Sequence, residues 1–366
     1  IAQLHVSVTV TAPDTGDTGD TGDTGDTGDT ADTADTADTS EPAELGVTTY
    51  GAEIGVPAGA WKGLSVGHDG VLWGASSGGL VRLDPEAGVA RVYGMADGLL
   101  TDSPTAVLAA RDGTVWVGHL GTTARQGEQV SVAADGTLTV MQPIDFTESD
   151  EITAVVRLTE ALAGAGVGDV WMGTNEGLCL WDADESVFAE HAHPTHPHGY
   201  TYGVAMSPDG DLWNGDAYQL SRWRYSHDGD LSPSADLEET VATWPVPVGD
   251  AIDIVDMDAD GADLWVVSDS FGVARVTVDA DVGESATQLF VEPLGATAVR
   301  ADGTGTVWIG TNTGLWTWDG ASLGELAADG IPTGGVESIA VDRSTTPPTV
   351  WLGTSTGLVR VVEQPG

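Results

Sequence analysis

The densest group of potential metal ligands in the chain is a histidine-rich segment near its middle. It holds four of the eight histidines within eight residues: His191, His193, His196 and His198. Two or three imidazoles held close together can bind zinc or copper. Two prolines stiffen the segment, however, and no acidic residue at a fixed spacing completes a ligand set. A solvated polar loop is therefore the stronger interpretation, and a transition-metal site is the alternative.

A second candidate site is an acidic segment with the spacing of a calcium-binding loop. Asp256, Asp258 and Asp260 alternate along the chain, Gly261 follows them, and Asp263 comes after the glycine. Alternating acids before a glycine can form the oxygen cage that Ca²⁺ prefers. Leu264 stands where the closing acid of such a loop is expected. Calcium is therefore one interpretation, an acidic hairpin turn is the other, and no other cofactor is expected.

No catalytic constellation is evident. The chain has no phosphate-binding lysine motif, and a His–Glu pair suited to lyase chemistry could come only from Glu190 and the histidine-rich segment. We therefore predict no catalytic residues and a protein that is not an enzyme, with a metal-assisted lyase or hydrolase as a weaker alternative.

A tryptophan repeat indicates the elements that must position these residues. Seven tryptophans, each preceded by valine or leucine, recur at spacings of 43, 55, 42, 52, 43 and 43 residues: Trp73, Trp116, Trp171, Trp213, Trp265, Trp308 and Trp351. Around each lie an alternating run, an Asp-Gly or similar turn, the tryptophan run, a glycine-containing turn and further alternating runs. The repeat predicts an all-β, seven-bladed β-propeller of four-stranded blades, with each tryptophan buried on a second strand.

The segment from Asp97 to Gly118 resembles the repeat of the two-component regulator propellers, the periplasmic ligand-sensing propellers of hybrid sensor kinases. The resemblance extends over roughly residues 45–362. It implies a ligand-sensing propeller, although this sequence lacks the transmembrane helix and kinase that follow in the family. A similar tryptophan-containing repeat also occurs in streptogramin lyase, so the fold alone does not decide the function.

The last repeat ends after its third strand, near Val362. Leu45–Gly51 matches the outer strand of the first repeat, and we expect it to complete the last blade and close the ring. We therefore divide the chain into an N-terminal strand at 1–11, an Asp-Thr-Gly/Ala linker at 12–42 and the propeller at 43–366.

The N-terminal strand has no place in the closed ring. Its apolar residues alternate along one face: Leu4, Val6, Val8 and Val10. A single strand must pair with something, and we expect this one to add to a blade edge of a neighbouring molecule. The main functional prediction is thus a structural protein that assembles with itself head-to-tail into a filament. The alternative is an extracellular sensor-like propeller that recognises a small molecule, peptide or glycan.

In a propeller, the first strands of all blades converge on the axis. Residues near the starts of these strands would then form an acidic ring at the mouth of the channel and could bind a cationic ligand: Asp102, Asp150, Glu151, His198, Asp250 and Glu337. Solvated loop acids are the alternative.

Composition excludes some partners. The chain has 12 Lys plus Arg against 57 Asp plus Glu, a net charge of −45. Nucleic acids and anionic membrane surfaces both require clustered basic residues, and no apolar run is long enough to span a membrane. The chain begins at Ile1 rather than Met, which we interpret as a mature end after signal-peptide removal and hence as an extracellular location. Its single cysteine, Cys179, lies in an apolar run and is expected to be a buried hydrophobe.

Overall fold

The computed structural model describes residues 6–11, 45–120, 125–145, 154–161, 167–184, 186–192, 201, 203–207, 210–215, 219–224, 237–243, 254–268, 272–278, 285–290 and 292–363. The helical elements among these residues are two short 3₁₀ turns, η1 (Ala52–Ile54) and η2 (Met95–Asp97). All other regular elements are β-strands. The predicted all-β class is therefore confirmed.

Six sheets have the predicted four-stranded form. In chain order, the first three are β3–β6 (Trp61–Val66, Leu72–Ser76, Gly79–Asp84, Val89–Tyr93), β7–β10 (Ala106–Ala109, Val115–Gly118, Gly127–Val132, Leu138–Ile144) and β11–β14 (Val155–Glu160, Val170–Thr174, Gly177–Asp182, Val187–Ala192). The next two are β15–β18 (Gly203–Met206, Leu212–Gly215, Gln219–Arg224, Leu237–Thr243) and β23–β26 (Ala296–Ala301, Val307–Thr311, Gly314–Trp318, Leu323–Glu325). The sixth joins β27 (Val336–Asp342), β28 (Thr349–Thr354) and β29 (Gly357–Glu363) to β2 (Leu45–Tyr50).

The remaining sheet corrects the expectation of seven blades with four strands each. Strands β19 (Ile254–Asp260), β20 (Asp263–Ser268), β21 (Gly272–Val278) and β22 (Ser285–Phe290) carry a fifth strand, β1 (Val6–Thr11). β1 runs parallel to β22 of the same chain. The N-terminal strand is therefore not isolated, because the unpaired outer edge of β22 provides its hydrogen-bonding partner. The described residues give no support for head-to-tail assembly or a filament.

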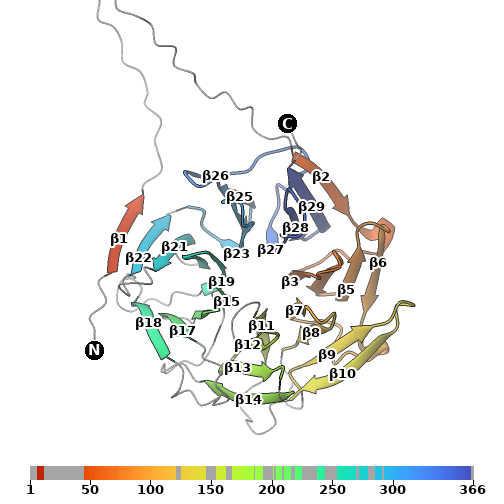
Figure 1. Ribbon diagram of the computed structural model, residues 1–366. Coiled ribbons are helices and arrows are strands. Elements are labelled where there is room, and N and C mark those ends of the chain that lie inside the picture. The colour runs from red at the N-terminus through yellow and green to blue at the C-terminus, as the bar shows by residue number, and fades with distance from the viewer. Residues whose placement is uncertain are drawn as a thin grey trace, which may run out of the picture.

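The sheets lie radially around a central axis, and their innermost strands are β3, β7, β11, β15, β19, β23 and β27 (Figure 1). This arrangement is a β-propeller. The hydrophobic core lies between adjacent sheets; Trp61, Leu72 and Val81 of one sheet, for example, pack with Trp351 and Leu358 of its neighbour. The seven repeat tryptophans are all buried and each lies on a second strand, as predicted. Cys179 is likewise buried, and burial raises the pKa of its thiol.

The strand that closes the ring is the one that the sequence predicts. β2 pairs antiparallel with β29, from Leu45 opposite Glu363 to Tyr50 opposite Leu358. The first described residues after the linker and the last described residues of the chain thus share one sheet (Figure 1). Every inner strand is consequently held in a complete sheet, which fixes the geometry of the axial channel.

The Asp-Gly turns between first and second strands explain part of the acid excess. In the turns at Asp69, Asp112 and Asp302, a carboxylate oxygen accepts a hydrogen bond from a backbone N–H two residues later. The glycine that follows Asp112 has φ of +83°, a conformation that favours glycine. Many acids of this chain therefore shape hairpins.

Candidate functional site

Five inner strands carry a β-bulge at the same point near their beginning. The pairing with the second strand skips one residue in each case, and the skipped residues are Lys62, Val156, Val255, Thr297 and Glu337. A bulge leaves its extra residue outside the regular ladder and can redirect its side chain, and bulges are common beside functional sites. We call these five residues the bulge ring.

The bulge ring varies in chemistry although its surroundings do not. The residue before each bulge is apolar and buried: Trp61, Val155, Ile254, Ala296 and Val336. The bulged residue itself is a lysine, a glutamate, a threonine or a valine. The residue before each bulge is therefore fixed by packing in the core, whereas the bulged residue is not. A bulged residue can vary with the ligand, because the core does not require a particular side chain there.

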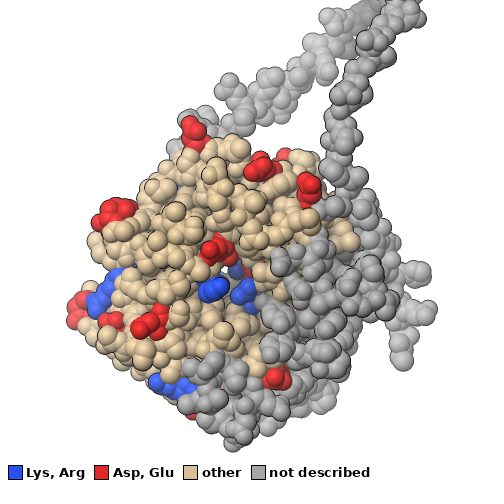
Figure 2. Space-filling model, turned by 180° about the vertical axis from the view of Figure 1, so that it is seen from behind, with Lys and Arg blue, Asp and Glu red and all other residues tan. Residues whose placement is uncertain are grey.

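The inner strands enclose a cavity of about 420 Å³. One face of the molecule opens at its centre, and basic and acidic side chains gather at the edge of this opening (Figure 2). Four basic residues line the cavity (Lys62, Arg157, Arg300 and Arg343), together with four acidic ones (Glu160, Asp256, Asp258 and Glu337). A third of the 12 basic residues of the chain are thus beside one channel. The formal charges of the described lining residues sum to zero, whereas the whole chain carries −45.

The lining divides into two arcs. The charged arc lies on β19, β23, β27 and β3 and contributes Asp256, Asp258, Arg300, Glu337 and Lys62. The apolar arc lies on β7, β11 and β15 and presents half-buried side chains, namely Leu108, Val156, Leu158 and Met206, although β11 also carries Arg157 and Glu160. The two arcs occupy different sides of the axis (Figure 1).

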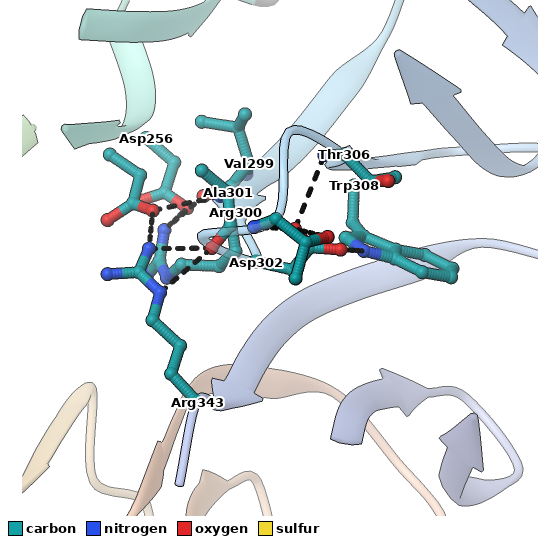
Figure 3. A network of polar contacts seen from close by, with 10 residues as sticks. Asp256, Val299, Arg300, Ala301, Asp302, Thr306, Trp308 and Arg343 are labelled. Atoms are coloured by element: carbon teal, nitrogen blue, oxygen red, sulfur yellow. Dashed lines mark hydrogen bonds and ion pairs between the residues drawn. The ribbon is translucent and has the colours of Figure 1, made fainter. Parts of the chain in front are cut away.

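Most charges of the channel are bonded to one another in what we call the Arg–Asp belt: Arg157, Asp256, Asp258, Arg300 and Arg343. Arg300 Nη1 lies 2.6 Å from Asp256 Oδ2, and Arg343 Nη2 lies 3.0 Å from Asp258 Oδ2 (Figure 3). Both aspartates also accept backbone N–H groups of β23, from Val299 to Asp256 and from Ala301 to Asp258. The belt therefore ties the inner strand of one sheet to that of the next.

Arg157 extends the belt across the channel. It lies on β11, yet its Nη2 donates to the carbonyl oxygen of Val255 on β19 at 2.5 Å, past the intervening strand β15. Its Nε also lies 3.7 Å from Asp256 Oδ1. Sheets that are not neighbours are thus joined through one guanidinium.

Burial and ion pairing shift the pKa values of the belt residues in opposite directions. Burial lowers the pKa of Arg157, with Asp256 opposing it, and burial raises the pKa of Asp258 although Arg300 and Arg343 oppose it. For Arg300, burial acts to lower the pKa, but the carboxylates of Asp256 and Asp258 outweigh it and the pKa is raised. Such groups keep their charge only while their partners remain.

The two charges of the bulge ring are bonded differently. Glu337 Oε2 accepts the backbone N–H of Trp61 at 2.6 Å, which places the carboxylate beside the residue that precedes Lys62. Its other oxygen, Oε1, has no hydrogen-bond partner among the described residues. Lys62, the single lysine of the chain, is exposed and joins no ion pair within the described part of the protein. The mouth of the channel thus offers one unpaired ammonium and one unused carboxylate oxygen.

The structure brings only part of the predicted acidic ring to the channel. Glu337 is there, as expected. Asp102 is not among the residues that line the cavity; its Oδ1 accepts the backbone N–H of Met95 at 2.7 Å and holds the turn before β7. The other predicted members, Asp150, Glu151, His198 and Asp250, lie outside the described residues, as do His193, His196 and Leu4. His191 contributes backbone to β14, and Val6, Val8 and Val10 contribute backbone to β1.

The four aspartates predicted as a calcium loop do not converge on one point. Asp256 and Asp258 lie on β19 and bond to Arg300 and Arg343, while Asp263 lies on β20 and pairs with Arg275 at 2.5 Å. No group of three or more potential metal ligands occurs among the described residues. The calcium interpretation is corrected for this segment, because alternating acids that the sequence presents as a loop occupy one side of a strand.

The sequence analysis missed the basic half of the site. Lys62, Arg157, Arg300 and Arg343 come from four different blades, and no local motif connects them. Their position in the repeat is the signal that could have found them. Each of Lys62, Arg157 and Arg300 lies one to four residues after the buried apolar residue that begins an inner strand.

A separate polar cluster lies at one end of the sheet β7–β10. His119 is fully buried, and its Nε2 lies 2.9 Å from Glu128 Oε1 while its Nδ1 lies 2.8 Å from the Thr101 hydroxyl. Glu128 pairs across β8 with Val117, and the corresponding residues of two other sheets are Val81 and Cys179. This sheet therefore replaces a buried apolar residue with a carboxylate.

Comparison with known proteins shows the fold. No family model and no curated protein matches the chain. Among solved structures, streptogramin B lyase superposes with a TM-score of 0.64 at 14% identity, covering 87% of this chain and 98% of the lyase. Virginiamycin B lyase from Staphylococcus aureus gives 0.63 at 15% identity, with 87% and 99% covered.

A third neighbour is the extracellular domain of the hybrid two-component system BT4673 from B. thetaiotaomicron. Its TM-score is 0.63 at 17% identity, and the match covers 89% of this chain but only 40% of that one. The resemblance to sensor propellers is thus supported at the level of the fold, and membership of that family is not. No helix among the described residues is long and apolar enough to cross a membrane.

The lyases correct one functional expectation. The sequence analysis predicted a protein that is not an enzyme, yet two of these neighbours are enzymes with the same overall architecture. The fold therefore gives no ground for excluding catalysis.

Proposed function

We propose that this chain is an extracellular ligand-binding β-propeller that recognises a small molecule at the mouth of its axial channel. The observation that carries the proposal is the bulge ring. Its five residues share one place in the repeat but differ in chemistry, and two of them, Lys62 and Glu337, carry charge that no described residue neutralises. Unpaired polar groups around a cavity of about 420 Å³ are typical of a small-molecule site.

The neighbours support the location and the class of function. Extracellular domains of two-component systems share the fold, which favours a sensor-like role outside the cytoplasm. This proposal replaces filament assembly as the main functional hypothesis.

We also propose that the five-stranded sheet acts as an ordinary blade with an added edge strand, giving a seven-bladed ring. Residues 43–366 would then form the propeller, and residues 1–11 and 12–42 would be an accessory strand and a linker.

The single lysine provides a direct test. Reductive methylation with ¹³C-formaldehyde keeps the positive charge and labels only Lys62 and the α-amine, so NMR of the full chain reports on the channel mouth. Pools of amino acids, sugars, organic acids and nucleotides are added in turn, and at least one pool should move the Lys62 signal. Lys62→Gln identifies that signal by its loss.

Calorimetry with the unmodified protein then measures the affinity for the active compound. If no pool moves the Lys62 signal, or if Lys62→Gln and Glu337→Gln bind the active compound as tightly as the parent, the proposed site is wrong.

A further inference from the structure

We infer that the ligand is a free, apolar α-amino acid. The inference rests on the proposed function and deepens it by naming the class of ligand. It is carried by the two arcs of the channel, since an apolar amino acid has a charged end and an apolar end.

The charged end would meet Lys62 and Glu337. The hydrogen bond from the Trp61 N–H to Glu337 Oε2 brings the carboxylate next to the strand that carries Lys62, while no ion pair joins the two side chains. One available ammonium and one available carboxylate oxygen at the same mouth match the carboxylate and ammonium of a zwitterion. A simple anion or a simple cation would leave one of them unused.

The apolar end would meet the opposite arc. Leu108, Val156, Leu158 and Met206 line the cavity and are only half-buried. Covering apolar surface is favourable, and among the described lining residues β7 and β15 carry no charged side chain. The two charged lining residues of β11 are bonded elsewhere, Arg157 to the carbonyl oxygen of Val255 and Glu160 to the backbone N–H of Arg111. A side chain such as that of leucine would remove this surface from water.

The Arg–Asp belt does not compete for the ligand. Arg300 and Arg343 are already paired with Asp256 and Asp258 at 2.6 and 3.0 Å. Breaking the Arg300–Asp256 pair would leave the buried Asp256 carboxylate without this partner, and the exposed Arg343 also donates to the carbonyl oxygen of Ala301. The ligand therefore takes its contacts from the bulge ring rather than from the paired charges of the belt.

The charge of the whole protein favours the same class. A chain of net charge −45 repels ligands with several negative charges. A zwitterion has no net charge and is not repelled, and its two charges can still bind to Lys62 and Glu337.

The test compares L-leucine with three analogues on the ¹³C-methylated full chain and by calorimetry on the unmodified chain. Leucinamide lacks the carboxylate, N-acetyl-leucine lacks the ammonium, and glycine lacks the side chain. L-Leucine should move the Lys62 signal and bind at least tenfold more tightly than each analogue.

Variants assign each contact. Lys62→Gln should weaken the binding of L-leucine at least tenfold but leave the binding of leucinamide, which lacks the carboxylate, unchanged. Glu337→Gln should weaken the binding of L-leucine at least tenfold but leave the binding of N-acetyl-leucine, which lacks the ammonium, unchanged. The fold should tolerate this second change, because a glutamine oxygen can still accept the Trp61 N–H. Val156→Ser should weaken the binding of L-leucine more than the binding of glycine. Glu325→Gln, an exposed change on β26 away from the channel, should alter none of these affinities.

Two outcomes overturn the inference in distinguishable ways. If a sugar, a nucleotide or a Leu-Gly dipeptide moves the Lys62 signal more strongly than every amino acid, the ligand class is wrong while the proposed function stands. If no compound of any class moves it, both fall.

Discussion

The Arg–Asp belt and the bulge ring contain the same kinds of charged side chain but differ in how they are bonded. In the belt, Asp256 accepts from both Arg300 and the backbone of Val299. In the ring, Lys62 has no partner among the described residues and Glu337 uses one of its two oxygens. The belt should therefore govern stability, and the ring should govern binding.

The difference follows from the backbone. Belt residues bond to backbone groups of other sheets: Asp256 and Asp258 accept N–H groups of β23, and Arg157 and Arg343 donate to carbonyl oxygens. Ring residues are extra residues of a bulge, and the ladder neither pairs nor buries them. Residues of the ring and of the belt can thus lie next to one another on the same strand, as Val255 and Asp256 do on β19.

Removing Asp256 should have the largest effect on stability. Asp256→Ala leaves Arg300 and Arg157 without their carboxylate in a buried setting, which should cost about 3–5 kcal/mol. Urea unfolding measures the loss, with the exposed change Glu325→Gln as a control expected within about 0.5 kcal/mol. A loss as small as the control's would mean that the belt does not hold the inner strands together.

The buried pair His119–Glu128 should show a smaller and non-additive effect. His119→Ser alone leaves Glu128 buried without its imidazole partner and should cost about 1–3 kcal/mol. The double variant His119→Ser, Glu128→Val restores the residue types of the sheet β3–β6, where Ser76 and Val81 stand. It should be more stable than the single variant by the same unfolding measurement. Additive losses would show instead that this sheet requires both polar residues.

Glu160 should make stability depend on pH. Burial raises the pKa of its carboxyl above the ordinary value, although the Arg111 backbone N–H opposes the shift. The folded state then holds this proton at a pH where the unfolded state has released it, so stability falls as pH rises through the folded pKa. Each pKa unit of difference between the two states contributes about 1.4 kcal/mol.

Glu160→Gln removes that titration. The free energy of unfolding of the variant should fall less than that of the parent as pH rises from 4.5 upward, the ordinary value of a glutamate. Glu325→Gln, an exposed change, should follow the parent. If the free energy of unfolding changed with pH in the same way for the parent and for Glu160→Gln, the pKa of Glu160 would not be raised in the folded protein.

The sequence predicted the elements better than the site. The tryptophan repeat placed one aromatic residue on each second strand, and the match between Leu45–Gly51 and the first repeat identified the closing strand, because both features recur along the chain. Counting from the repeat also brings Glu337 to the start of an inner strand, and it is the second residue of β27.

The remaining features depend on contacts that a single sequence does not encode locally. The alternating acids from Asp256 to Asp260 fit both a calcium loop and one side of a strand, and only the arginines from other blades decide between the two. The bulges shift the register by one residue without a glycine or proline to mark them. The N-terminal strand alternates in the predicted way, but alternation does not specify which edge it joins.

The smallest expected effect on stability completes the comparison between belt and ring. Lys62 is exposed, lies in a bulge and has no ion-pair partner among the described residues. Lys62→Gln should therefore change the free energy of unfolding by less than about 0.5 kcal/mol, although it should weaken the binding of L-leucine at the channel mouth at least tenfold. Urea unfolding of the variant beside Asp256→Ala provides the measurement. If Lys62→Gln destabilised the protein as strongly as Asp256→Ala, the lysine would be a structural partner within the ring, and the division of the channel into a stabilising belt and a binding ring would have to be abandoned.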